Sequence, residues 1–345
     1  MIARTLLATL ALAAIIGGCA PAITAVGAPQ VIGTPVSAVG AAKATPAPKP
    51  SATPTQRPAL PPAAAAQAPA LLPSAAGDLA GAAAWDRYTI IAAVSPGDLT
   101  VRGTVTLDMV NRYGVDLDRL SFHLYPNHPD FGGRLDVTSA SVNGAPVPSD
   151  TQLGDTLLRL ELKTPLRPGD SAQVVLGFVA RTTRNASAKT FGAYNFEAGV
   201  WSMANFYPIL ARHFADTGWD TRPIDSRGDF AVSSVALYDV TIDAPIGWTL
   251  VSTGVSISDV PVNAQVHRQR IVSGPQREFY LGALQGLGEA EAVVDGTRVV
   301  SYFQPGSADA GKLGLEVAAR SLRAFNARYG AYPLAELEVV QAALT

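Results

Sequence analysis

The sequence has 345 residues, of which 48% are hydrophobic and 16% charged, and its 26 basic and 28 acidic side chains give a net charge of −2. This length corresponds to about two domains, and the near-neutral charge excludes, as the default, a nucleic-acid-binding protein with a strongly basic surface. The chain contains one cysteine, which excludes both a disulfide framework and a zinc cluster built from thiolates.

Residues 1–18 have the pattern of a signal peptide. Arg4 precedes an apolar run from Leu6 to Ile16, which is too short to cross a bilayer, since that takes about 20 residues. The run ends in Ile16-Gly17-Gly18-Cys19, which resembles the bacterial lipobox; an ordinary signal peptide is the alternative. The resemblance implies that Cys19 becomes the acylated N-terminus of the mature protein. Because two or more acyl chains give stable membrane attachment, we expect a lipid-anchored protein on the extracytoplasmic side of the bacterial cell membrane.

The next segment, residues 19–84, is dominated by alanine and proline. Residues 20–84 hold 23 Ala and 12 Pro and no aromatic residue. Such a composition buries too little apolar surface to order the chain, and the prolines oppose a continuous helix. We therefore predict a disordered tether over residues 19–84, semi-extended where proline is dense. The folded part is expected to start near Trp85, and its 261 residues contain every Trp, Tyr and His, enough for a sizeable core.

From Trp85 onward, apolar and polar residues alternate. The segments Tyr88–Val94 and Leu99–Asn111 flank Pro96-Gly97-Asp98, which predicts two strands joined by a tight turn. Asn143-Gly144 is the pair that a type I′ hairpin turn requires. Further strands are predicted at Leu120–Tyr125, Val137–Val142, Thr156–Leu162, Ala172–Val179, Ser234–Ile242, Trp248–Thr253, Gln265–Val272 and Glu278–Leu284. About ten short strands separated by turns indicate a mainly β fold, with an antiparallel β-sandwich or saddle over residues 85–288.

Residues 289–345 have a different pattern. A strand at Val299–Phe303 is followed by a predicted helix from Ala308 to Tyr329 and a further strand at Leu337–Ala342. Gly330 ends the helix. One apolar stripe runs along it, formed by Leu315, Ala318, Leu322, Phe325 and Tyr329. Strand, helix and strand in succession indicate the start of a mixed α/β segment.

Motifs that carry chemistry are few. No HExxH, GxSxG or Walker loop occurs. None of the histidines pairs with another at the three- or four-residue spacing that places two metal ligands on one helical face; they are His123, His128, His213 and His267. For His123 and His128 a hydrogen-bonded strand end is the favoured interpretation, and for His213 and His267 a solvated or capping role. Four aspartates lack EF-hand spacing and predict paired surface charges; they are Asp216, Asp220, Asp225 and Asp229.

Several short motifs occur in an order that points to a family. They are Trp201, Phe206-Tyr207-Pro208, Gly218-Trp219-Asp220, Gly228-Asp229-Phe230, Tyr238-Asp239-Val240, Pro245-Ile246-Gly247-Trp248 and Thr253-Gly254, preceded by Leu124-Tyr125-Pro126-Asn127. This order resembles the N-terminal β domain of the bacterial aminopeptidase N-like zinc metallopeptidases (gluzincins). The stretch Phe325–Val340, with Tyr332-Pro333, is similar to the helix end and strand that open the catalytic domain of that family. The resemblance extends from about Tyr88 to Val340.

The resemblance implies a β domain at residues 85–288 and the start of a truncated catalytic domain at residues 289–345. In the complete family, Zn²⁺ held by HExxH and a downstream glutamate activates water, and peptides are hydrolysed from their N-terminus. This chain reaches Thr345 before those motifs. No catalytic, cofactor-binding or metal residue can therefore be assigned, and we expect the chain to be inactive alone. The residue that holds the substrate amine in that family has no clear match, although Glu197 lies near its expected place.

Two functions stay open at this stage. The first is the membrane-anchored N-terminal portion of a zinc aminopeptidase, in which Leu315, Leu322 and Phe325 would face a missing catalytic domain and lie exposed here. The second is a non-catalytic surface lipoprotein whose β-sandwich binds a partner or substrate. An exposed corner with Trp201 and Trp219 would support the second function, but packing of these rings at a sandwich corner is the favoured interpretation. The sequence contains no signal of oligomeric state.

Overall fold

The computed structural model describes residues 65–184, 193–225 and 231–342. The predicted signal peptide, Cys19 and the tether up to residue 64 lie outside the described residues. Among those that are described, no helix is both long and apolar enough to cross a membrane. The fold is mainly β, as the alternating pattern predicted.

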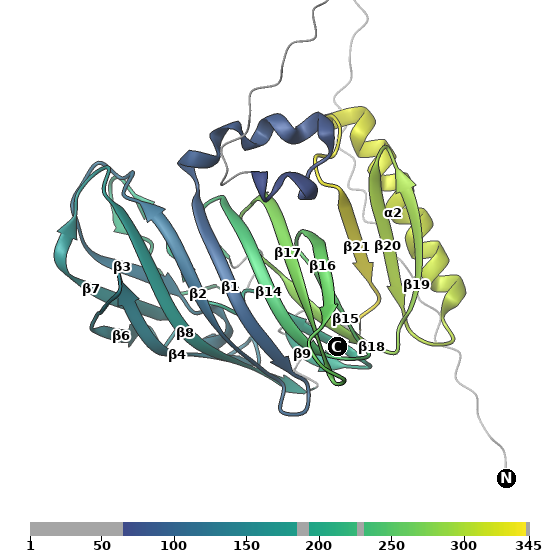
Figure 1. Ribbon diagram of the computed structural model, residues 1–345, viewed down its shortest axis with the longest axis horizontal. Helices are drawn as coiled ribbons and strands as arrows, with labels where there is room; N and C mark the ends of the chain where they lie inside the picture. Colours follow the sequence, from purple (N-terminus) through teal and green to yellow (C-terminus); the bar gives the residue numbers. More distant parts are fainter. Residues whose placement is uncertain (1–64, 185–192, 226–230, 343–345) are drawn as a thin grey trace, which may run out of the picture. The chain divides into compact units, whose positions relative to one another are not determined.

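The prediction of a tether up to residue 84 is wrong for residues 65–84. Two 3₁₀ helices, η1 (Ala68–Ala70) and η2 (Pro73–Ala84), occupy this segment and lie over the ends of the central strands (Figure 1). Leu71, Leu79 and Ala82 are buried in a small core with Leu237. The composition argument failed here because a few leucines supply apolar surface that packs on the large sheet, while Pro69 and Pro73 stand at the starts of the two helices, where a missing N–H costs no hydrogen bond.

The largest sheet has 12 strands, in the order β15-β18-β10-β9-β8-β2-β1-β14-β17-β16, with β4 pairing β8 and β5 pairing β4. These strands are β1 (Asp86–Ser95), β2 (Thr100–Val110), β4 (Gly133–Val142), β5 (Ala145–Pro146), β8 (Ser171–Arg184), β9 (Tyr194–Glu197), β10 (Val200–Met203), β14 (Ala236–Pro245), β15 (Trp248–Ser252), β16 (Val255–Pro261), β17 (Val266–Gln276) and β18 (Leu281–Gln285). Most neighbours are antiparallel, but β1 pairs with β14 and β8 pairs with β9 in parallel. The turn between β4 and β5 has positive φ at Asn143 (50°) and Gly144 (78°), which confirms the predicted type I′ geometry.

A second sheet of four strands, in the order β11-β3-β7-β6, packs on the first. It contains β3 (Leu117–His123), β6 (Ser149–Gln152), β7 (Leu157–Leu166) and β11 (Ile209–Leu210). Leu120 and Phe122 of β3 lie opposite Leu160 and Leu158 of β7, and all four are in the core that the two sheets share. The alternate residues of β3 and β7 therefore point outward, away from this core. The β-sandwich prediction is thus confirmed. The outer face of the four-stranded sheet takes no part in the core.

Two short elements complete this side of the molecule. The predicted strand at Leu120–Tyr125 ends at His123, and the chain turns into the 3₁₀ helix η3 (Tyr125–Asn127), because Pro126 has no N–H to continue a ladder. Beyond β11, the hairpin β12 (His213–Phe214) and β13 (Gly218–Trp219) forms a separate two-stranded unit.

The C-terminal segment forms a three-stranded sheet with one helix along it (Figure 1). It consists of β19 (Gly288–Val294), β20 (Thr297–Phe303), α2 (Ala308–Tyr329) and β21 (Glu336–Val340), with β20 and β21 parallel. The helix has the predicted bounds, but only part of its apolar stripe is covered. Leu322 is buried, with Leu315 packed beside it, against Val294 and Val299 of the sheet, so the expectation that these two leucines lie exposed is wrong. Phe325 and Tyr329 remain 58% and 79% exposed.

Candidate functional site

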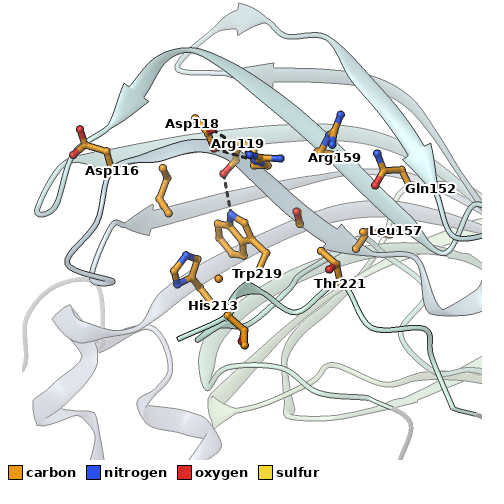
Figure 2. Close-up of a pocket in the computed structure, with 13 residues that line it drawn as sticks. Asp116, Asp118, Arg119, Gln152, Leu157, Arg159, His213, Trp219 and Thr221 are labelled. Atoms are coloured by element: carbon orange, nitrogen blue, oxygen red, sulfur yellow. Dashed lines mark hydrogen bonds and ion pairs between the residues drawn. The ribbon is translucent and has the colours of Figure 1, made fainter. Parts of the chain in front are cut away.

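The main candidate site is a cavity on the outer face of the four-stranded sheet. A cavity of about 420 Å³ opens between this face and the β12–β13 hairpin. Figure 2 shows Arg119, Arg159 and Gln152 coming from the sheet, and His213 and Trp219 from the hairpin below them. The strand registers account for this, since Arg119 pairs with Glu161 and Asp150 with Arg159. Positions that alternate with the core leucines therefore line one polar face.

The hairpin side of the cavity is aromatic. The indole of Trp219 is half-buried, and its Nε1 donates a hydrogen bond to the carbonyl oxygen of Arg119 at 3.1 Å (Figure 2). The His213 ring packs at a right angle to this indole, with centroids 5.1 Å apart, and stacks on Tyr113 at 4.6 Å. Burial lowers the pKa of His213 below its usual value. The three rings thus pack together as one aromatic wall, and burial favours the neutral form of His213.

The sheet side carries ion-paired guanidinium groups. Arg119 Nε and Nη2 donate to the two carboxylate oxygens of Asp118 at 3.0 and 3.2 Å. Arg159 Nε lies 2.8 Å from Glu161 Oε1 and 3.4 Å from Asp150 Oδ1. Neither arginine was identified as a candidate from the sequence. Their alternation with the core leucines indicates that they lie on the outer face of their strands. It does not show which strands pair, so it could not bring the two arginines together.

A second, smaller hollow of about 220 Å³ lies further along β3 and contains His123, Tyr125, Asp220 and Arg222. The His123 imidazole is only 4% exposed, and its ring stacks on Tyr125 at 5.1 Å. Burial lowers the pKa of His123, and the Asp220 carboxylate opposes that shift. Asp220 accepts two hydrogen bonds of 2.8 Å from Arg222, which hold the pKa of its carboxyl below the usual value.

The remaining polar candidates from the sequence lie apart from these hollows. The backbone N–H of Asp130 donates to His128 Nδ1 at 3.1 Å. His128 follows η3 and not a strand, so the hydrogen-bonded strand end favoured for His123 and His128 is wrong for His128. His267 Nδ1 lies 2.7 Å from Asp259 Oδ1 on neighbouring strands. Asp220 is ion-paired with Arg222 as predicted, but its carboxylate is buried and not at the surface. Asp229 lies outside the described residues.

The motif residues that pointed to a family are mostly buried. Trp201 is fully buried, which confirms packing within the sandwich for this residue and excludes it from an exposed corner. Tyr207 and Tyr238 belong to a cluster of aromatic rings with Tyr88, whose ring stacks on that of Tyr238 at 5.1 Å. The Tyr207 hydroxyl accepts a hydrogen bond from the backbone N–H of Phe279 at 3.2 Å. These residues hold the sandwich together and face no cavity.

The half-buried carboxyl group of Glu338 joins the C-terminal segment to the large sheet. The backbone N–H of Ser252 in β15 donates to Glu338 Oε2 at 2.9 Å, and the Tyr302 hydroxyl donates to Oε1 at 3.4 Å. Burial raises the pKa of Glu338 to about 7, opposed by the hydrogen bond from Ser252. This carboxyl is therefore partly protonated at neutral pH.

Comparison with known proteins adds the following. No protein-family model and no curated protein matches the sequence. Among solved structures, a mutant of a two-domain M1 zinc metallopeptidase bound to L-arginine is 19% identical over 74% of this chain, with a TM-score of 0.52. The M1 zinc metallopeptidase from Deinococcus radiodurans gives the same values. A mutant of that protein bound to a Tyr-Ser-Ala substrate is 20% identical over 74% of this chain, also with a TM-score of 0.52.

This chain covers 56% of the length of each of these structures. The likeness shows a shared fold, and these neighbours are aminopeptidase N-like, which is the family that the sequence resembles. Zinc is the metal that the fold implies. Within the described parts of the chain, no three His, Cys, Asp or Glu side chains lie close enough to hold a metal ion. The described residues therefore do not fit a zinc site.

Proposed function

We propose that this chain is the N-terminal portion of an M1-type zinc aminopeptidase, anchored in the bacterial cell membrane on its extracytoplasmic side by acylated Cys19. In this proposal, residues 85–288 form the N-terminal β domain, preceded by the packed segment 65–84, and residues 289–345 open the catalytic domain. The observation that carries it is the fold shared with M1 zinc metallopeptidases over 74% of the chain. The order of the buried motifs, from Trp201 to Tyr238, supports the same relation.

Peptides are the proposed substrates of the complete protein, because the Deinococcus structure contains a Tyr-Ser-Ala substrate. The described residues hold no ligand set for zinc, so hydrolysis would depend on ligands from elsewhere. We therefore expect this polypeptide alone to be inactive. Its part in the reaction would be structural, with the β domain and β21 supporting the catalytic segment that follows in M1 proteins.

The decisive experiment starts from the gene. An open reading frame that continues beyond Thr345 and encodes Gly-x-x-Glu and HExxH supports the proposal, and a stop codon followed by an unrelated gene contradicts it. An aminopeptidase assay tests the expectation that this polypeptide alone is inactive. The chain from residue 20, made without its lipid, should release no product from aminoacyl-p-nitroanilides with added Zn²⁺. Chelator-sensitive release by this polypeptide would show that it holds a zinc site of its own.

The second candidate is a non-catalytic surface lipoprotein with a binding module. The observation that favours it is the cavity of Figure 2, which is formed entirely by the β-sandwich and its hairpin. Both candidates predict membrane attachment through Cys19, so localisation does not separate them. The reading frame beyond Thr345 does, because only the peptidase requires a catalytic domain.

A further inference from the structure

The cavity between the β12–β13 hairpin and the four-stranded sheet has the size and the walls of a small-molecule binding site. Its volume, about 420 Å³, is within the range of small-molecule sites. Three strands of one sheet and a hairpin contribute to it, so its shape is set by the fold and not by a single loop. Gly218 and Trp219 belong to the motifs that resemble the peptidase family, but the peptidase proposal gives no residue of this cavity a role in hydrolysis, so ligand binding here can be tested independently of it.

One wall offers a rigid apolar surface. The Trp219 indole is held by its hydrogen bond to the Arg119 carbonyl oxygen and by the perpendicular His213 ring. A fixed aromatic side chain loses little conformational entropy when a ligand packs against it. This wall suits a ligand that has an apolar ring face or edge.

The opposite wall offers hydrogen-bond donors that the protein does not use. Arg119 engages Asp118 through Nε and Nη2 only, and Arg159 approaches its carboxylates through Nε. Within the described residues, no further hydrogen bond engages their remaining Nη groups. Despite its short distance to Glu161, Arg159 Nε is buried without a well-directed hydrogen bond among the described residues, and Ser121 lines the cavity beside it. A buried polar group without a partner costs stability, so a ligand that supplies hydrogen bonds would stabilise this wall.

The charges around the cavity restrict the ligand further. The two guanidinium groups are accompanied by four carboxylates, Asp116 and Asp118 at the rim and Asp150 and Glu161 as partners of Arg159. This excess of negative charge disfavours an anion, although arginines are present. The unused donors in turn require acceptor atoms, which a simple cation lacks.

We propose that this cavity binds a neutral saccharide. A sugar ring presents C–H groups on one side, suited to the Trp219 indole, and hydroxyl groups that both donate and accept. Those hydroxyls would accept from Arg119 and Arg159 and exchange hydrogen bonds with Ser121 and with Gln152, whose amide lies at the edge of the cavity (Figure 2). The ion pairs Asp118–Arg119 and Glu161–Arg159 keep the polar groups in place before the ligand arrives.

The test is a glycan array probed with the chain from residue 20, followed by calorimetric titration with neutral disaccharides such as cellobiose, maltose and chitobiose. We expect at least one neutral saccharide to bind, and the matched sugars that carry a carboxylate, such as glucuronides, to bind about tenfold more weakly. Arg159→Gln and Gln152→Ala should each weaken binding, by about tenfold and threefold. The matched control is Arg270→Gln on β17, whose guanidinium pairs with Asp239 away from the cavity, and it should leave binding unchanged.

Three results would overturn the proposal. They are the absence of binding to every neutral saccharide, a preference for the acidic sugars, and equal affinity of the Arg159→Gln variant and the unmodified chain. Trp219→Phe keeps an aromatic wall but removes the hydrogen bond to Arg119, and we expect about a threefold loss of affinity. Because Trp219 also packs against His213, circular dichroism of each variant must match that of the unmodified chain before affinities are compared.

Discussion

Replacing Glu338 by glutamine should change how the stability of the protein depends on pH. The carboxyl of Glu338 is surrounded by β15 and β20 and accepts hydrogen bonds from Ser252 and Tyr302. Burial raises its pKa from 4.5 to about 7. The folded protein therefore binds this proton more tightly than the unfolded chain does. Since the folded pKa is raised, the stability contributed by the protonated carboxyl is present at low pH and is lost as the pH rises from about 4.5 to about 7.

The size of the effect follows from the shift. The pKa of Glu338 rises from 4.5 to about 7, a difference of about 2.5, and each pKa unit is worth about 1.4 kcal/mol, so ionising Glu338 destabilises the fold by about 3 kcal/mol once the pH is well above 7. At pH 5 the corresponding penalty is about 1 kcal/mol. Glutamine cannot ionise and retains one oxygen as an acceptor. The unfolding free energy of Glu338→Gln, taken relative to that of the unmodified protein, should therefore be about 2.5 kcal/mol higher at pH 8 than at pH 5.

The assay is urea denaturation of both proteins at pH 5 and pH 8, compared as the difference of their unfolding free energies at each pH. The comparison within each pH cancels the titration of other groups. Glu316→Gln on the exposed side of α2, where the carboxylate is 63% exposed, serves as the control and should show the same difference at both pH values. If Glu338→Gln also shows no dependence on pH, the Glu338 carboxyl is hydrated in the folded protein and the reasoning from burial fails.

Three further predictions concern packing, a buried hydrogen bond and the lipid anchor. Gly311→Ala should destabilise the protein by about 1–3 kcal/mol, because the added methyl group would overlap the Phe303 ring. Gly314→Ala, whose added methyl group meets its nearest atom at 3.4 Å, should instead stabilise α2 by up to about 1 kcal/mol in the same denaturation assay. Tyr207→Phe should lower the unfolding free energy by about 1–3 kcal/mol, since it leaves a buried backbone N–H without its acceptor; an unchanged value would mean that water replaces the hydroxyl. Cys19→Ser should move the protein from the membrane fraction to the soluble fraction and abolish labelling by radioactive palmitate, and retention in the membrane would contradict the proposed anchor.

The parts of the fold that the sequence predicted are those with a long, regular pattern. The strands β1 and β2 and the helix α2 were predicted within about two residues, because ten or more residues of one period outweigh local exceptions. The short strands β9 to β13 have two to four residues each, too few for any period to be visible. The parallel pairing of β1 with β14 joins Tyr88 to Tyr238, and no local pattern contains such a contact.

The candidate cavity could not be predicted from the sequence for a related reason. Arg119 and Arg159 are 40 positions apart in the sequence, and each is an ordinary polar residue in an alternating strand. They share one face only because Ser121 pairs with Arg159 across β3 and β7. Trp219 was recognised as a candidate for ligand contact or corner packing, and the structure shows it lining the cavity. Its hydrogen bond to Arg119 depends on the position of the hairpin relative to the sheet.

The distribution of the motif residues explains why the resemblance predicts the fold better than the chemistry. Trp201, Tyr207 and Tyr238 are fully buried, so in this chain they serve to close the sandwich and lie away from any surface chemistry. A fold held by such residues persists at 19% identity, while the groups at its surface are free to change. The polar face with Arg119 and Arg159 lies outside that core. A function found there would belong to this chain, and the shared fold would neither require it nor argue against it.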